Sequence, residues 1–149
     1  MKTFRFRKRS PIGGLAVDID AEADFSGATP SNAVQIYRNI WLELPRSPMH
    51  WRDAAWLMCG ISVHSDILNT LHPNGLTIRV CNLSFPASDY VPEVAAFAMD
   101  GWLREEFNLA PADIGVEYDS VNSRYIFSWG SGMPFSEESS GIPTLHTWR

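Results

Sequence analysis

Residues 15–25 read LAVDIDAEADF, and this regular alternation of apolar and acidic side chains decides the kind of fold. Its acidic side carries Asp18, Asp20, Glu22 and Asp24, which we call the acidic ladder. An alternation with period two is typical of a β-strand that has one buried and one solvent-exposed face. The stretch therefore predicts a sheet with a core on one side only.

Two neighbouring segments repeat the same alternation. Residues 4–7, Phe-Arg-Phe-Arg, precede the stretch and are separated from it by the turn sequence Ser-Pro-Ile-Gly-Gly at 10–14. Residues 34–44 follow it, and Arg38 interrupts their apolar side, so we expect a bulge or twist near Arg38 and Asn39. Three successive strands with short connections predict an N-terminal antiparallel meander.

Helical and strand patterns then follow one another. Ser47 and Pro48 have the residue types of a helix N-cap and first helical position. The expected segments are helices at 47–60 and 61–71, a strand at 76–85, a helix at 91–107 and a closing hairpin at 114–129. The order predicts an α+β fold, with an antiparallel sheet of about five to six strands and two to three helices packed on one face.

The length of 149 residues favours one hydrophobic core, which we place in a single domain over residues 1–130. Residues 131–149 are rich in Ser, Gly and Pro and show no period. We expect this C-terminal tail either to be mobile or to pack on the surface of the domain.

Charge is distributed unevenly along the chain. The net charge is −5, yet five of the 12 basic residues lie within the first nine positions, so the remainder holds 7 basic against 17 acidic groups. An acidic body disfavours nucleic acid and favours a basic protein as partner. The alternative is internal neutralisation, in which Arg7 pairs with Asp18 and Arg5 with Asp20 across two strands.

The sequence also predicts a cytoplasmic protein without a membrane partner. No apolar run approaches the ~18 residues that span a bilayer, and no apolar signal region follows the basic N-terminus. Cys59 and Cys81 are too few for a secreted disulfide framework, and we expect both to be reduced and buried.

Motifs for metal, cofactor or catalysis are missing from the sequence. The four histidines lack zinc spacing, no Cys-x-x-Cys occurs, and no glycine-rich phosphate loop is present. We therefore expect no cofactor, no metal and no catalytic residue. An alternative small enzyme or ligand-binding domain would have a pocket between sheet and helices, using His64, Asp66 and Asp89.

Tyr37 and Trp41 lie on the more polar side of their expected strand, next to Gln35 and Glu43. Exposed aromatic side chains of this kind are frequent anchors of protein interfaces. The alternative is that another element or the C-terminal tail covers them.

In size and charge the chain resembles bacterial immunity proteins, which neutralise a partner toxin by tight binding. That resemblance implies a basic toxin as partner. Our leading hypothesis is a non-enzymatic protein-binding module whose binding residues are the acidic ladder with Tyr37 and Trp41. A third hypothesis is a structural subunit or homo-oligomer that associates through the sheet.

Overall fold

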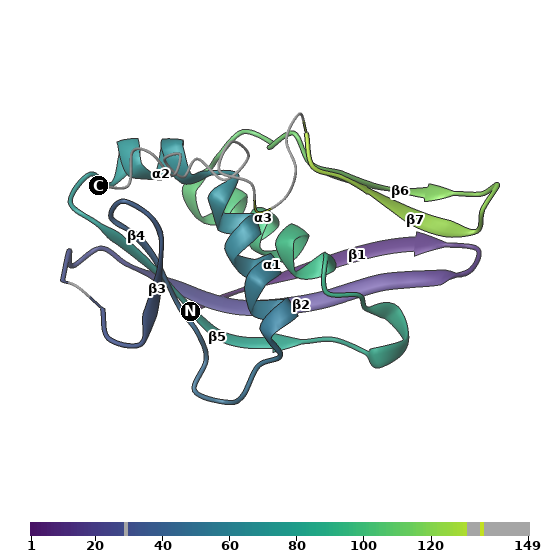
Figure 1. The fold of residues 1–149 in the computed structure, drawn as a ribbon, viewed down its shortest axis with the longest axis horizontal. Coiled ribbons are helices and arrows are strands. Elements are labelled where there is room, and N and C mark those ends of the chain that lie inside the picture. The colour runs from purple at the N-terminus through teal and green to yellow at the C-terminus, as the bar shows by residue number, and fades with distance from the viewer. Residues whose placement is uncertain (29, 131–134, 136–149) are drawn as a thin grey trace.

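A computed structural model of the chain describes residues 1–28, 30–130 and 135 and has an α+β fold (Figure 1). The strands are β1 (Lys2–Ser10), β2 (Gly13–Asp24), β3 (Ala33–Tyr37), β4 (Ile40–Glu43), β5 (Leu76–Ser84), β6 (Gly115–Asp119) and β7 (Arg124–Ser128). The helices are α1 (Trp51–Ser62), α2 (Ser65–Leu71), the 3-10 helix η1 (Ala87–Asp89) and α3 (Val94–Phe107). The predicted fold class is confirmed. The predicted tail at 131–149 lies outside the described residues, except for Phe135.

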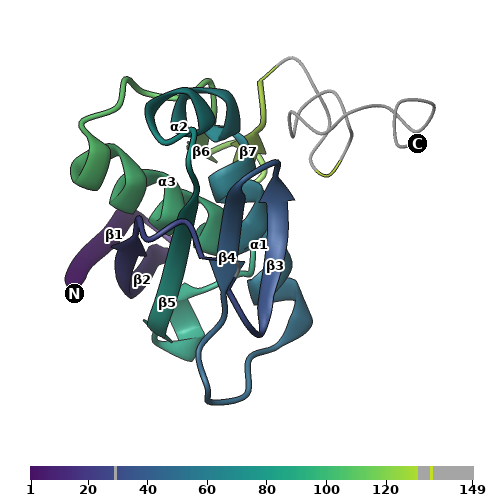
Figure 2. The ribbon, with the colours of Figure 1, turned by 90° about the vertical axis from the view of Figure 1, so that its left-hand side faces the viewer.

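The main sheet has five strands in the order β1-β2-β5-β4-β3, seen edge to edge in Figure 2. It is mixed, since β4 and β5 run parallel while the other neighbouring strands are antiparallel. The predicted meander therefore holds only for β1 and β2. The third neighbour is β5, which enters the middle of the sheet because the crossover through α1 and α2 returns the chain beside β4.

The alternating segment at 34–44 forms a separate hairpin at the far edge of the sheet. Its predicted bulge is instead the turn between β3 and β4, where Arg38 adopts a positive φ of 49°. Arg38 breaks the apolar alternation because the chain reverses at this point. A register shift between Gln35 and Tyr37 completes the connection.

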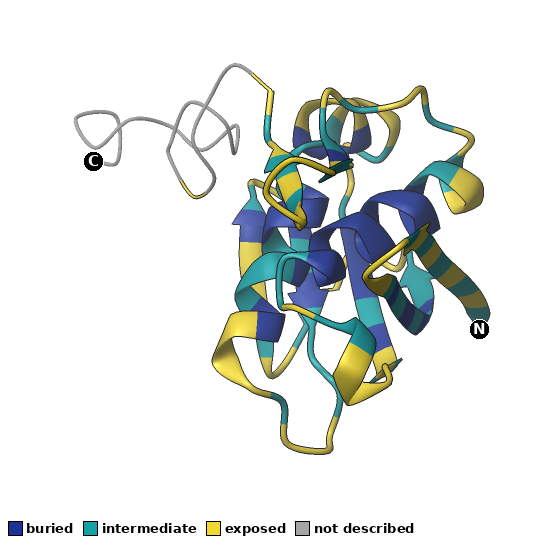
Figure 3. Ribbon diagram, turned by 90° about the vertical axis from the view of Figure 1, so that its right-hand side faces the viewer, coloured by how far each residue is buried: buried dark blue, intermediate teal, exposed yellow. Residues whose placement is uncertain are grey.

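Both long helices cover one face of the sheet and leave the other face, which we call the outer face, without helices (Figure 2). Residues 94–103 of α3 are all buried, as the dark ribbon in Figure 3 shows. α1 approaches α3 closely at Gly60, where an added Cβ would lie 2.6 Å from the carbonyl oxygen of Ala96. The core therefore lies between the α1–α3 layer and the inner side of the sheet.

All three helix starts differ from their predicted positions, and α2 begins at Ser65 rather than at 61 because α1 continues to Ser62. α1 begins at Trp51 rather than near Ser47, and the ring of His50 caps it by accepting a hydrogen bond from the Arg52 amide. α3 begins at Val94, three residues after the predicted Val91, because residues 91–93 form turns whose carbonyls accept hydrogen bonds from the amide three residues further on, such as Val91 from Val94. Ser47 and Pro48 therefore lie in the loop before α1 and not in the helix itself.

The predicted closing hairpin is confirmed as β6 and β7, which form a two-stranded sheet of their own. It packs through Phe127 against Phe97 of α3, with ring centroids 5.8 Å apart. The hydroxyl of Tyr125 donates to the carbonyl of Gly13 in the β1–β2 turn, which fixes the hairpin near that end of the main sheet.

Candidate functional site

The acidic ladder lies on the outer face of β2, as its alternation predicts. β1 pairs with it in a register that places Arg5 opposite Asp18 and Thr3 opposite Asp20. The predicted register, with Arg7 opposite Asp18 and Arg5 opposite Asp20, is therefore displaced by two residues, although Arg7 still reaches Asp18 diagonally as an ion pair. The cause is the tight turn, in which Ser10 already faces Gly13 and only two residues connect the strands.

The N-terminal part of the ladder is neutralised within the chain, in line with the internal alternative. Asp18 forms ion pairs with two guanidinium groups, with Arg7 Nη2 at 2.7 Å and Arg5 Nε at 3.6 Å. Asp20 accepts a hydrogen bond from the hydroxyl of Thr3 and has no cationic partner among the described residues. The charge of Asp18 is therefore neutralised by arginines of β1, whereas Asp20 keeps its negative charge.

The C-terminal part of the ladder is different, because Glu22 and Asp24 share one cation, Arg79 of β5, with Glu43 of β4. Arg79 Nη1 lies 2.8 Å from Glu22 Oε1, Nη2 lies 3.5 Å from Asp24 Oδ2, and Nε donates to Glu43. We call these four residues the Arg79 cluster. Three carboxylates against one guanidinium leave a surplus of two negative charges.

The protonation of the Arg79 cluster follows from these contacts. Hydrogen bonds to Glu22 and Glu43 raise the pKa of Arg79 above its usual value, so it stays charged. Asp24 accepts hydrogen bonds from the Ser26 main chain and side chain, which lower its pKa, and Arg79 lowers it further. Asp24 is therefore ionised at neutral pH, which maintains the negative surplus.

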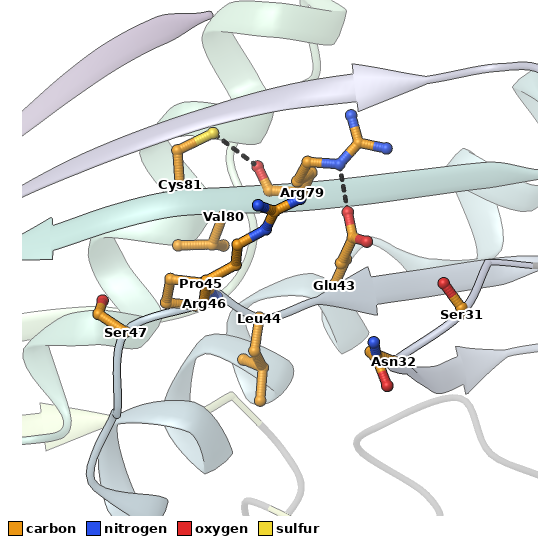
Figure 4. A pocket seen from close by; sticks show the side chains of 10 residues that line it. All are labelled: Ser31, Asn32, Glu43, Leu44, Pro45, Arg46, Ser47, Arg79, Val80 and Cys81. Carbon is orange, nitrogen blue, oxygen red and sulfur yellow. Dashed lines mark hydrogen bonds and ion pairs between the residues drawn. The ribbon is translucent and has the colours of Figure 1, made fainter.

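Next to the Arg79 cluster lies a groove of about 790 Å³, drawn in Figure 4. Its walls are Ser31 and Asn32 before β3, residues 43–47 at the end of β4 and beyond it, and residues 79–81 of β5. β4 ends at Glu43, and the chain then turns away from β5 past Pro45 (Figure 4). We call this opening between the diverging β4 chain and β5 the fork groove.

The structure does not bring Tyr37 and Trp41 together as one aromatic surface. Trp41 faces Gln35 and Thr77 on the outer face, whereas the register shift in β3 places Tyr37 opposite Ile40. Both aromatic side chains are only partly exposed. Trp41 also borders a small cavity of about 60 Å³ together with the Gly27 loop, so part of its surface is covered.

The residues proposed for an enzymatic pocket are also apart. His64 is buried and its Nε2 lies 2.7 Å from Oδ1 of Asp100, a residue of α3 that the sequence did not single out. Asp66 is exposed on α2, while Asp89 lies beside the glycines of the β1–β2 turn. Neither cavity described above is lined by any of these residues.

The two cysteines have different environments. Cys59 is buried, and this burial raises the pKa of its thiol to about 11. Cys81 is exposed, which corrects the prediction that both would be buried. It is the extra residue at a register shift between β2 and β5, so its side chain does not follow the alternation of the strand.

Sequence reasoning found the acidic ladder but missed Arg79 and Glu43 as parts of the same site. The signal was present, because Arg79 is the sole charged residue in the strand at 76–84. Its partners could not be assigned from the sequence, since β4 and β5 become neighbours only through the parallel crossover.

Comparison with protein-family models, curated proteins and solved structures found no match for the chain. Among the described residues, no helix combines the length and apolar character needed to cross a membrane. Within the same residues, no three His, Cys, Asp or Glu side chains gather in a group suited to a metal ion.

Proposed function

We propose that this chain is a non-enzymatic protein-binding module whose partner presents basic side chains to the outer face of the sheet. The observation that carries the proposal is the Arg79 cluster, where three carboxylates share one guanidinium beside an open groove. A lysine or arginine of a partner would offset the remaining negative charge. Electrostatic complementarity of this kind steers association and selects the partner.

The location of the charge also supports binding rather than internal stabilisation. The side chain of Arg79 is 39% exposed, and those of Glu22 and Asp24 are 39% and 36% exposed. Partly exposed charges remain accessible to a second protein, and their mutual pairing adds little to stability in water. A basic toxin, which the resemblance to bacterial immunity proteins implies, is one partner with the required chemistry.

The test is retention of a partner from native lysate by the immobilised chain, with bound proteins identified by mass spectrometry. The triple variant Glu22→Gln, Asp24→Asn, Glu43→Gln removes three negative charges from the Arg79 cluster. Its matched control removes three exposed carboxylates elsewhere, through Asp66→Asn, Glu105→Gln and Glu117→Gln.

We expect wild type and the matched control to retain one basic protein in stoichiometric amount, and the triple variant to lose it. Thermal melting of each variant verifies that the domain is folded. Equal retention by the triple variant and the control would show that the Arg79 cluster is not the binding surface. A fold stabilised by a metabolite, with no protein retained, would instead support the ligand-binding alternative.

A further inference from the structure

Among the described residues, the unpaired strand edges of the main sheet include β1, β3 and the second half of β5, and the first two are protected. β1 carries five cationic residues, Lys2, Arg5, Arg7, Lys8 and Arg9, which oppose the addition of another strand. β3 is only five residues long and is interrupted by a register shift. Short, irregular or charged edges are the usual means by which proteins avoid unwanted pairing.

The third stretch is the second half of β5, residues 80–84, which lacks the charges that protect β1 and has the bulge at Cys81 as its irregularity. β5 pairs with β4 only as far as Arg79, while its pairing with β2 continues to Ser84. Its sequence here, Val-Cys-Asn-Leu-Ser, contains no charge. Among the described residues, no main-chain hydrogen bond satisfies this stretch on the side where β4 has ended.

The fork groove borders the start of this open edge, at Val80 and Cys81. β4 leaves β5 at Pro45, a residue without an N–H group that cannot continue a central ladder of hydrogen bonds. The whole groove measures about 790 Å³, within the range of about 300–1,000 Å³ that is common for binding sites. An added strand needs a separation of about 4.8 Å from β5, which the position of β4 beside Leu76–Arg79 already defines.

Charge determines what kind of strand fits. A strand in this position continues the line of β4, so its outer side chains follow Glu43 and then run beside Asn82 and Ser84 of β5. Glu43 belongs to the Arg79 cluster, which has a surplus of two negative charges, and Asp20, which faces Asn82, adds a third without a cationic partner among the described residues. Arg46 of the groove wall offsets one of these three charges, so one or two basic side chains on alternate positions of the strand complement the site.

We infer that the fork groove receives an extended segment of the partner protein, with lysine or arginine at alternate positions, as an added strand along residues 80–84 of β5. This inference rests on the proposed function and specifies its binding mode. Main-chain hydrogen bonds to β5 hold the segment, and the Arg79 cluster selects its basic side chains.

The probe is a blocked heptapeptide of alternating threonine and lysine, titrated by calorimetry at low ionic strength. Two further versions carry N-methyl groups on alternate amides, one on the odd-numbered and one on the even-numbered positions. Because the amides of a strand point alternately to its two sides, only one of these versions loses its hydrogen bonds to β5. A fourth peptide has every lysine acetylated.

We expect one methylated version to bind at least about tenfold more weakly than the parent peptide, and the other to bind nearly as well. The acetylated peptide loses affinity. At a peptide concentration ten times Kd, hydrogen exchange of the unpaired amides within 80–84 slows about 11-fold. Ser84→Lys weakens binding by placing a cation on the edge, whereas Ser120→Lys in the β6–β7 turn leaves it unchanged.

Equal affinity of both methylated versions would overturn strand addition, since surface attraction alone does not distinguish the two sides of a strand. Slowed exchange of the same amides without peptide, together with dimerisation, would assign the groove to a second copy of the chain. Failure of every peptide, while the triple variant still loses the partner, would refute strand addition and leave the proposed function intact.

Discussion

Replacing Arg79 with methionine changes stability and binding in opposite directions. The substitution removes the cation that three carboxylates share, while the aliphatic part of the side chain is kept. Exposed ion pairs contribute about 0.2–1 kcal/mol each, so loss of three pairs with Glu22, Asp24 and Glu43 destabilises the fold by about 0.6–3 kcal/mol. For a chain of this size that lowers the Tm by roughly 1–12 °C.

Binding improves because the negative surplus of the cluster rises from two to three charges. One unit charge removed at about 6 Å in water changes the interaction with a bound lysine by roughly 0.7 kcal/mol, which is about threefold in affinity. We expect the threonine–lysine peptide to bind Arg79→Met about threefold more tightly at low ionic strength. The gain disappears in about 1 M salt, where the screening length falls to about 3 Å.

Thermal melting followed by circular dichroism measures the first effect, and calorimetric titration measures the second. Arg124→Met is the matched control, because it makes the same change of net charge in the β6–β7 hairpin, where Arg124 pairs only loosely with Asp119 at 3.9 Å. We expect the control to change neither quantity appreciably. Weaker peptide binding by Arg79→Met would refute the argument, because it would make Arg79 itself a contact of the ligand.

Four other outcomes are expected. Gly60→Ala destabilises the domain by about 1–3 kcal/mol in urea denaturation, because the new Cβ meets the main chain of α3. This holds although alanine is the better helix former, so a more stable variant contradicts the close approach of α1 and α3. At pH 8 a thiol reagent modifies only Cys81 in the native protein and both cysteines in urea, since burial raises the pKa of Cys59 to about 11. Rapid modification of both cysteines in the native protein contradicts this. Deleting residues 1–9 removes β1 and lowers stability by at least about 3 kcal/mol, whereas an unchanged Tm rules out the pairing of β1 with the acidic ladder. The pKa of Asp24 is lower in the folded chain than its usual 3.8, so its contribution to stability is complete above pH 3.8 and is lost as the pH falls further. Asp24→Asn therefore makes unfolding in acid depend less steeply on pH. An acid transition identical to that of the wild type contradicts the shift.

The alternating stretches explain why the fold class was predictable. Side-chain period alone assigns β2 and its buried face, and the turn at 10–14 identifies β1 as its partner. Helix α3 was recognisable because it is apolar around most of its circumference. These are local properties, and local patterns constrain elements more strongly than they constrain neighbours.

The order of the strands and the residues of the candidate site could not be predicted from such local patterns. Arg38 interrupts an apolar face equally well in a bulge and in a turn, so one strand was predicted where two exist. The insertion of β5 between β2 and β4 depends on a crossover whose path the sequence pattern does not encode. Arg79, Glu43 and the fork groove follow from that insertion, so the acidic ladder was only half of the candidate site.

The register of β1 shows how a small local error moves a charge pair. Both the predicted and the observed pairing place arginines on the outer face, because the parity of a strand fixes the face. The length of the turn fixes the register, and a two-residue connection shifts Arg5 from Asp20 to Asp18. Asp20 is thereby left with a hydroxyl partner, which parity alone did not predict.

Hydrogen exchange of the chain, alone and with the partner retained from lysate, tests the central claim most directly. The account predicts slower exchange of amides at 80–84 of β5 and in the groove wall at 43–47, with no change in the β6–β7 hairpin. Protection confined to α3, α2 or that hairpin, with 80–84 exchanging as fast as in the free chain, would contradict binding at the outer face.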